Sequence, residues 1–346
     1  MTNFKRVAIL VALLLLSHQW PRASASSDAS RSIFERLFNG HKVINVVDDF
    51  LVFWEQAKDK PLARQRVLWR RMVENKHRDY FDRAVYRSAD PKSRRAMLDE
   101  FLVRIPERVD SIREFNKNIS DIRTSPLVLA FIDFRTRFPE YQQQRNVCIG
   151  LSLFRFDGAV RPVENDAGIP DTLCLGAEVL CRYTPEQFRI ALAHEFFHLY
   201  HFGFLFQQPA LAEFRTPHMP LMIEGMAVAA TEAIYPNHPR SYYLHFSDEE
   251  LAAQQRNLAP SAERFLELIA SAAPPEQYEM WFTNMQSDEA PPRGGYLLGY
   301  EVTNRVLATF TLEQMVRMSP ADLREHAEEQ LAAMAGDRVL VLAPSY

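Results

Sequence analysis

The segment from His194 to His198 reads His-Glu-Phe-Phe-His, and its residue types could hold a metal ion and act on a water molecule. On a helix, residues four apart leave the same face, about 6 Å from one another. Two imidazole nitrogens at that spacing can bind one zinc ion at about 2.1 Å each. Glu195 lies one step round the helix, where its carboxylate can act on a metal-bound water without being a ligand. We therefore predict that His194 and His198 are metal ligands and that Glu195 is the catalytic base.

A catalytic zinc site needs a third protein ligand and an open fourth position. His201 lies seven residues after His194, about 10 Å along the same helix, which is too far for one ion to bridge. We expect it to be a neighbour of the site or a surface residue. Glu224 begins the sequence Glu-Gly-Met-Ala, whose small residues let a second helix approach closely. We predict that Glu224 is the third ligand and that Zn²⁺ is the cofactor.

HEFFH followed by EGMA resembles the gluzincins, metallopeptidases that carry HExxH on one helix and a glutamate on the next. The combination is especially similar to a bacterial family of predicted zinc-dependent proteases. That family also has an aromatic-rich helical region before the site and a Gly-Tyr-x-x-Gly-Tyr segment after it, which residues 295–300 match. The likeness covers roughly residues 40 to 320, although only HExxH and EGxA are specific. It implies a thermolysin-like zinc site and leaves the substrate open.

The same resemblance implies that the apparent strand 171–182 is the sheet edge that pairs with an extended peptide substrate. Within it, Gly-Ala-Glu at residues 176–178 is similar to the Gly-Ala-x-Glu stretch of aminopeptidases, but the match is one residue short. We therefore assign no amino-terminus-binding role to Glu178. We expect it to be a solvent-facing carboxylate on the strand.

Peptide hydrolysis also needs a donor for the oxyanion that forms when the carbonyl is attacked. Tyrosine suits this role, because its hydroxyl is neutral at pH 7 and donates well. Tyr296 and Tyr300 lie four apart, on one face of a helix expected to begin near Gly295. The Tyr-x-x-Gly order from Tyr296 is similar to the catalytic tyrosine segment of zinc aminopeptidases. We predict Tyr296 as the donor; the alternative is that both tyrosines are core aromatics.

The elements that must position these residues follow from the apolar periodicity. Residues 26–145 repeat apolar positions every three or four residues and predict a helical N-terminal region. Alternation from residue 146 predicts strands within 146–183, with a turn at Asp157-Gly158. Thr184, Pro185 and Gln187 predict the start of the HExxH helix. The metal-binding helices span 184–235, with the second expected over about 220–234, and further helices follow to residue 346. The predicted fold is α+β and mainly helical, with a small sheet before the HExxH helix of a thermolysin-like zincin core.

The first residues predict an export signal. Lys5 and Arg6 precede an apolar run of ten residues, and Ala-Ser-Ala at 23–25 has the pattern that signal peptidases accept. Ten apolar residues are too few for a spanning helix, which needs about 20. We predict a signal peptide over residues 1–25 with cleavage after Ala25, so that the mature chain has no membrane span and is periplasmic or secreted. An uncleaved membrane anchor is the alternative.

Three cysteines stand in the predicted strand region. Cys174 and Cys181 would lie about 23 Å apart if both are on one strand, so they could not bond to each other. Cys148 lies on another predicted strand and could reach one of them if the two strands pair. An oxidising compartment permits that bridge without requiring it.

The composition and net charge are those of a globular protein and argue against nucleic-acid binding. The net charge of −4, with 47% apolar and 24% charged residues, is ordinary for a globular protein and gives no electrostatic footprint for nucleic acid. We predict a zinc-dependent hydrolase, in the first place a peptidase with a peptide or protein substrate. Two alternatives stay open: a non-catalytic zinc-binding protein of the cell envelope, and a metal hydrolase that acts on a non-peptide substrate.

Overall fold

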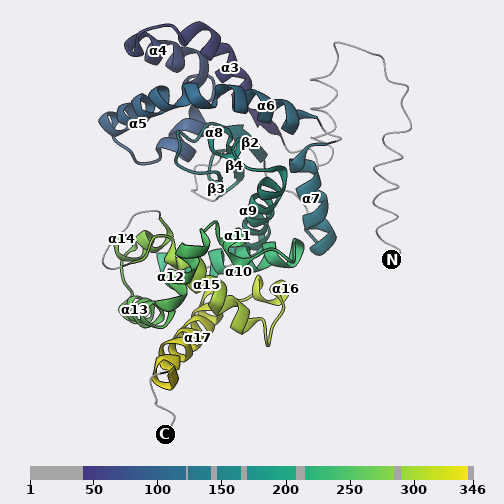
Figure 1. Ribbon diagram of the computed structural model, residues 1–346, viewed down its shortest axis with the longest axis vertical. Coiled ribbons are helices and arrows are strands. Elements are labelled where there is room, and N and C mark those ends of the chain that lie inside the picture. The colour runs from purple at the N-terminus through teal and green to yellow at the C-terminus, as the bar shows by residue number, and fades with distance from the viewer. Residues whose placement is uncertain are drawn as a thin grey trace, which may run out of the picture.

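The computed structural model describes residues 42–121, 124–141, 146–164, 170–207, 215–283 and 290–341, with side chains up to residue 336. The described chain is mainly helical and contains one small sheet, as the sequence predicts. In Figure 1 the N-terminal helices lie above the sheet and the C-terminal helices lie below it. The predicted signal peptide, residues 1–25, lies outside the described residues.

The N-terminal helices enclose an aromatic core. The ring of Trp69 lies 5.5 Å from that of Phe53, 5.5 Å from Phe81 and 5.2 Å from Phe101, centroid to centroid. Such large rings bury much apolar surface and prefer the edge-on and tilted contacts seen here. The elements of this region are α3 (Val46–Ala57), α4 (Leu62–Trp69), η1 (Arg70–Glu74), η2 (Tyr80–Tyr86), α5 (Pro91–Arg104), η3 (Ile105–Arg108), α6 (Val109–Ser120) and α7 (Pro126–Arg137).

The sheet has four strands in the order β1-β2-β4-β3. They are β1 (Val43–Asn45), β2 (Asn146–Gly150), β3 (Gly158–Arg161) and β4 (Thr172–Gly176). The first three in the sheet order are parallel, and β3 runs antiparallel to β4. β1 falls inside the region 26–145 that we predicted to be helical, so that prediction was wrong there. A strand of three residues is too short to show the alternation of a strand. Its last residue, Asn45, is also the N-cap of α3, where its side chain accepts a hydrogen bond from the Val47 N–H.

The predicted strand 171–182 ends early. β4 stops at Gly176, where a Cβ would overlap the carbonyl oxygen of Phe156, and the helix α8 (Ala177–Leu180) follows. Glu178 is on that helix and fully buried, so the expectation of a solvent-facing carboxylate was wrong. Its Oε1 accepts hydrogen bonds from the Ser152 hydroxyl and the Phe154 N–H, both at 2.8 Å. The free edge on this side of the sheet is β3, because β4 lies between β2 and β3.

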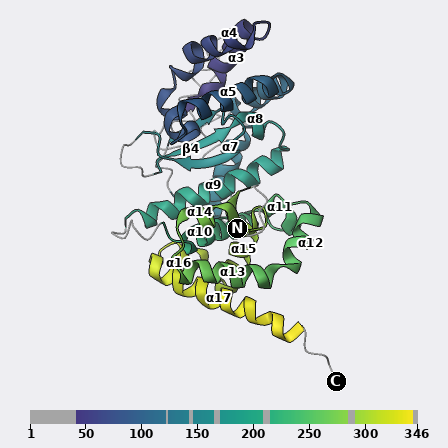
Figure 2. The same cartoon turned by 90° about the vertical axis from the view of Figure 1, so that its left-hand side faces the viewer.

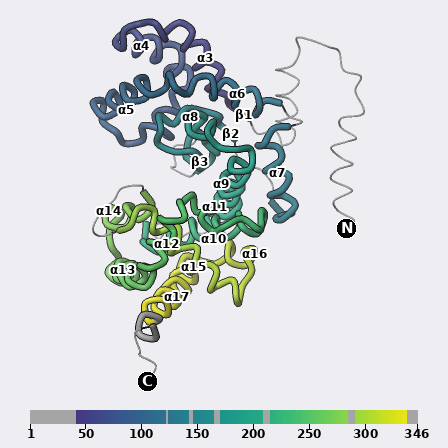
Figure 3. Tube along the Cα trace, viewed as in Figure 1, coloured from purple at the N-terminus to yellow at the C-terminus, as the bar shows by residue number. Residues whose placement is uncertain are grey.

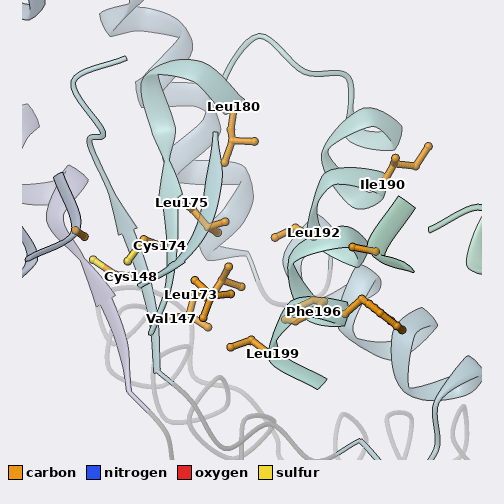
Figure 4. Close-up of a cluster of buried hydrophobic side chains, with 14 of the residues drawn as sticks. Val147, Cys148, Leu173, Cys174, Leu175, Leu180, Ile190, Leu192, Phe196 and Leu199 are labelled. Atoms are coloured by element: carbon orange, nitrogen blue, oxygen red, sulfur yellow. The ribbon is translucent and has the colours of Figure 1, made fainter. Parts of the chain in front are cut away.

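The strand pairing brings two cysteines together, as the sequence allowed. Cys148 on β2 lies opposite Cys174 on β4, and both are buried free thiols. Figure 4 shows their sulfur atoms on the side of the sheet away from the neighbouring helix. Cys181 is also free and follows α8 rather than standing on the strand of Cys174.

The HExxH helix is α9 (Pro185–Leu205), and its predicted start is confirmed. The Thr184 hydroxyl accepts from the Gln187 N–H while the Gln187 side chain accepts from the Thr184 N–H, which completes the capping box. In Figure 4, Leu192, Phe196 and Leu199 of α9 face the sheet side chains Val147, Leu173 and Leu175. α7 packs against α9 as well. A helix that is apolar round most of its surface belongs in the interior, and α9 lies between the sheet and the C-terminal helices (Figure 2).

The C-terminal half is helical throughout its described part, as Figure 3 traces. Its elements are α10 (His218–Ile234), α11 (Arg240–Leu244), α12 (Asp248–Arg256), α13 (Leu258–Ala270), α14 (Pro275–Tyr278), η5 (Glu279–Phe282), α15 (Gly294–Val306), α16 (Leu312–Met315) and α17 (Pro320–Val341). α10 packs between α9 and α15, and α17 lies across α10 and α13. Within the described ranges, no helix combines the length and the apolar character needed to cross a membrane.

Candidate metal centre

The three predicted metal ligands converge on one point. His194 Nε2 lies 3.0 Å from Glu224 Oε2 and 3.0 Å from His198 Nε2, and His198 Nε2 lies 3.3 Å from Glu224 Oε2. Three donors on a tetrahedral zinc ion at about 2.1 Å would be separated by about 3.4 Å. The observed separations are slightly shorter, so small outward shifts of the three donor atoms would accommodate a zinc ion. These side chains form a group that could hold a metal ion.

Close contact between α10 and α15 helps to fix Glu224 in this position. A Cβ on Gly225 would overlap the main-chain carbonyl of Gly299, and a Cβ on Gly299 would overlap the carbonyl oxygen of Leu221. Only glycine at both positions lets the two backbones approach so closely. Gly225 directly follows Glu224, and Gly299 lies in the same helix as Tyr296. The glycines of the EGMA and Gly-Tyr-x-x-Gly-Tyr segments therefore bring the third ligand and the predicted donor into one site.

The electrostatics of the group favour a cation. Burial opposes the charge of Glu224, but the adjacent imidazoles of His198 and His194 hold the pKa of its carboxyl well below the ordinary value. Burial and the neighbouring His198 lower the pKa of His194, so this ring stays neutral and keeps a lone pair to donate. An ionised carboxylate and a neutral imidazole are ligands that a zinc ion accepts. At His198, burial acts to lower the pKa but the Glu224 carboxylate raises it above the ordinary value, so this ring would release a proton on binding a metal.

Glu195 lies beside the metal-ligand group without joining it. The side chain is buried, and its Oε2 has no hydrogen-bond partner among the described residues. Burial raises the pKa of Glu195 to about 8, although His198 next to it acts in the opposite direction. On the sheet side, a Cβ on Gly158 would lie 2.6 Å from Glu195 Cγ, so that only glycine leaves room for this side chain. A buried carboxyl with one oxygen unpartnered is suited to bind a water and exchange a proton with it.

The two candidate tyrosines have different environments. The ring of Tyr296 lies 6.4 Å from the His194 ring, and its hydroxyl makes no hydrogen bond within the described part of the chain. Burial and the charge of Glu224 raise the pKa of Tyr296 well above its ordinary value, so the hydroxyl keeps its proton. Tyr300 is fully buried, and its hydroxyl donates to Glu232 at 2.6 Å. Of the two, Tyr296 is the one beside the metal ligands.

The remaining histidines of interest do not join the ligand group. His201 is a buried neighbour of the site, so the surface alternative was wrong. Burial lowers the pKa of His201 to about 3, and neither ring nitrogen has a partner among the described residues. His218 is buried at the start of α10, where its Nε2 lies 3.1 Å from the Pro320 carbonyl oxygen and ties α10 to α17.

A polar group that we did not predict borders the metal ligands, close enough for the charge of Asp157 to act on His194 and Glu195. Asp157 accepts from the Tyr183 hydroxyl at 2.7 Å and from the Gly158 N–H at 2.8 Å. Burial opposes its charge, but the Tyr183 hydrogen bond and the Gly158 N–H hold the pKa of Asp157 below the ordinary value. The ring of His245 stacks on Tyr183, and the guanidinium of Arg293 lies 4.6 Å from the Tyr296 ring.

These residues come from four separate segments, so no spacing in the sequence could have linked them. The only local signal was Asp157-Gly158, which we interpreted as a turn. The chain bends at Asp157, but Gly158 already begins β3, so the turn prediction was wrong at Gly158.

Comparison with known proteins adds no relative: no protein-family model, no curated protein and no solved structure matches this chain. Its function is therefore inferred from the residues and geometry of the site.

Proposed function

We propose that this chain is a zinc-dependent hydrolase whose metal is held by His194, His198 and Glu224. The observation that carries the proposal is the position of Glu195. A buried carboxyl with an unpartnered oxygen lies beside three converging donor atoms. A tetrahedral ion held by three protein donors would have a fourth position for a reactant. A purely structural zinc site has four protein ligands and no need for such a carboxyl.

The side chains then have separate roles. When bound, zinc supplies a Lewis acid that acidifies water and polarises a carbonyl. Glu195 takes a proton from the water that attacks the carbonyl carbon and delivers it to the leaving amine as the carbon–nitrogen bond breaks. The Tyr296 hydroxyl donates to the carbonyl oxygen as it becomes negative. Its raised pKa supports this role, because a tyrosine that keeps its proton remains a donor.

The free edge of the sheet favours a peptide substrate. Gly176 N–H donates to the Asp157 carbonyl and Asp171 N–H donates to the Arg161 carbonyl, so these odd-numbered residues of the β3 segment direct their main-chain groups toward β4. In an antiparallel pair the alternate residues, Gly158 and Val160, direct theirs to the open side. An extended peptide can pair with such an edge, and at Gly158 it would lie next to Glu195.

A thermolysin-like core, as the gluzincin resemblance implies, is part of the same proposal. Its features here are a mixed sheet with an antiparallel edge strand, HExxH on α9 and a glutamate ligand on α10. The peptide-pairing edge is assigned to β3 in place of the strand 171–182 that we predicted. We also propose that the chain is exported to the periplasm or secreted, because residues 1–25 have the pattern of a signal peptide.

Metal analysis of the purified protein, paired with cleavage of a diverse peptide library read by mass spectrometry, tests the proposal. We expect one zinc per chain, and cleavage that Glu195→Gln removes without loss of metal, because an amide cannot accept the proton. Zinc without hydrolysis of any substrate would favour the non-catalytic envelope protein. Hydrolysis of esters or other bonds, with peptides untouched, would favour the non-peptide hydrolase.

A further inference from the structure

A cavity of about 520 Å³ lies on the N-terminal side of the sheet, apart from the metal ligands. Its walls come from η2 and α5 on one side and from the segment leading into β3, with the end of β3, on the other. Figure 1 shows α5 above the sheet and α9 below it. Apolar side chains such as Met97 and Phe156 line part of the cavity, and three arginines with one glutamate supply the charge: Arg87, Arg155, Arg161 and Glu100.

Among the residues that line this cavity, positive charges outnumber negative ones. Glu100 already accepts a hydrogen bond from Arg104 through Oε1 at 2.6 Å, and its Oε2 lies 3.8 Å from Arg155. Arg87 and Arg161 form no ion pair with any acidic side chain in the ranges described. The cavity therefore carries an excess of cationic groups with hydrogen-bond donors to spare.

Of the three arginines, Arg161 has the largest free-energy cost from lacking a negatively charged partner. Its side chain is largely buried, and its Nε is buried with no hydrogen-bond partner among the described residues. Burial lowers the pKa of Arg161, and the like charge of Arg87 lowers it further. The guanidinium lies 5.8 Å from the Phe156 ring, which cannot replace a hydrogen-bond acceptor. A buried guanidinium without a hydrogen-bond acceptor, next to a second one, is unfavourable unless an anion joins them. A planar guanidinium matches a carboxylate in two parallel hydrogen bonds.

The position of Arg161 on β3 connects this cavity to the proposed reaction. Gly158 faces Glu195 on α9, and side chains along a strand alternate between the two faces of the sheet. Arg161, three residues on, therefore leaves the opposite face, toward the cavity, about 10 Å along the strand. A peptide paired with the β3 edge would alternate in the same way. Its side chains would point in turn toward the metal ligands and toward the cavity.

We propose that this cavity is a subsite that binds a carboxylate of the peptide substrate, with Arg161 as its main contact and Arg87 as its second. The subsite rests on the proposed peptidase function and gives it a substrate class, peptides with an acidic group a few residues from the bond that is cut. The carboxylate belongs either to an aspartate or glutamate side chain or to the peptide's C-terminus. Both supply the same planar anion.

Binding without turnover tests the subsite separately from catalysis. The probes are fluorescent alanine-rich hexapeptides with blocked ends and one internal glutamate, the same peptides with glutamine, and the glutamine peptides with a free C-terminus. Titrated into the full-length Glu195→Gln protein, the glutamate or free-terminus peptides should bind roughly 10- to 100-fold more tightly than the neutral ones. Which of the two binds identifies the source of the carboxylate. Equal affinity for all three would overturn the proposal.

Variants of the arginine complete the test. Arg161→Gln should remove the preference and leave the neutral peptide's affinity within about twofold, and Arg161→Lys should restore part of it. Arg113→Gln, which removes an exposed arginine of α6, is the control for loss of one positive charge. Loss of affinity for the charged and neutral peptides alike in Arg161→Gln would assign it a structural role and overturn the subsite. Carboxylate-selective binding by a protein that hydrolyses no peptide would support the subsite and refute the peptidase.

Discussion

The N-terminal helices and the α10–α15 pair are held together in opposite ways. Around Trp69 the space between helices is filled by aromatic rings such as Phe53 and Phe101, with centroids 5 to 6 Å apart. Between α10 and α15 there is no side chain at the crossing point, because Gly225 and Gly299 bring backbone against backbone. Side chains in an aromatic core can be repacked with a modest loss of stability. Two backbones in contact cannot accommodate an added atom unless the helices move apart. The rigid contact is the one next to the metal ligands.

The largest expected effect comes from deleting a ligand, because rigid helices cannot move another donor into its place. Loss of a residue that only hydrogen-bonds to a metal ligand lowers metal affinity by up to about 100-fold. His194→Ala removes a ligand itself, so it should lower zinc affinity by more than this and abolish hydrolysis. Glu224→Ala should behave in the same way. Metal titration with a competing chelator measures both.

His201→Ala is the control for a buried histidine of α9 outside the ligand group. It should lower stability through the cavity it leaves and keep the metal. If His201→Ala lost zinc and Glu224→Ala retained it, the third ligand would be on α9 and the assigned group would be wrong.

The next largest effect concerns the donor carried by α15. Tyr296→Phe removes one hydroxyl and should lower kcat by about 10²–10³, with zinc content and KM nearly unchanged. Tyr300→Phe is the matched control, because its hydroxyl is bound to Glu232. That variant should keep its rate and lose about 1 kcal/mol of stability. A rate loss in Tyr300→Phe alone would move the donor role by one helical turn.

The comparison also explains which parts could be read from the sequence. The HExxH helix and its capping box depend on residues within one or two turns of each other, so their spacing was enough. Glu224 was also within reach, because the small residues after it indicate a close helix contact. That Gly299 is the partner of this contact was not predictable, since the two glycines are 74 positions apart and only the fold brings them together.

The sheet was predicted less well than the helices. β3 was not predicted as a strand, because Asp157-Gly158 was interpreted as a turn. β4 was predicted to be longer than it is, because Gly176 and the buried Glu178 interrupt the strand through tertiary contacts with Phe156 and Ser152. A carboxylate in such a sequence is usually exposed, and here its partners come from a loop more than 20 residues earlier. The role of β3 as the edge followed only from the strand order.

Replacing a glycine at the α10–α15 crossing tests whether this contact is as rigid as proposed. Gly299→Ala must separate α10 from α15 and should cost about 1–3 kcal/mol or more, together with a loss of zinc affinity as Glu224 shifts. Phe53→Leu in the aromatic core should cost stability by a similar amount and leave zinc affinity unchanged. Denaturant unfolding and zinc titration of both variants give the two quantities.

Gly203→Ala in α9 is the control for the helix-propensity term, because a Cβ there meets nothing within 4 Å. It should stabilise the protein by roughly 0.5–1 kcal/mol. If Gly299→Ala were equally stabilising, the close approach of the two helices would be refuted.

Acid stability gives a further difference, which should come from a histidine buried in the C-terminal half. Burial lowers the pKa of His218 to about 4, against an ordinary value of 6.5. Between these two pKa values the unfolded chain binds a proton at His218 and the folded chain does not. The neutral, buried His218 therefore contributes its full share to the free energy of unfolding above pH 6.5, and this share is lost as the pH falls toward 4. Between pH 7 and pH 5 this should reduce the free energy of unfolding by about 2 kcal/mol.

His218→Gln can still donate to the Pro320 carbonyl but cannot titrate. Urea unfolding of both proteins, stripped of metal to remove the pH dependence of zinc binding, should show the wild type losing about 2 kcal/mol more than the variant over this range. Parallel pH curves would mean that His218 titrates normally in the folded protein and that its burial at the α10–α17 contact is incomplete.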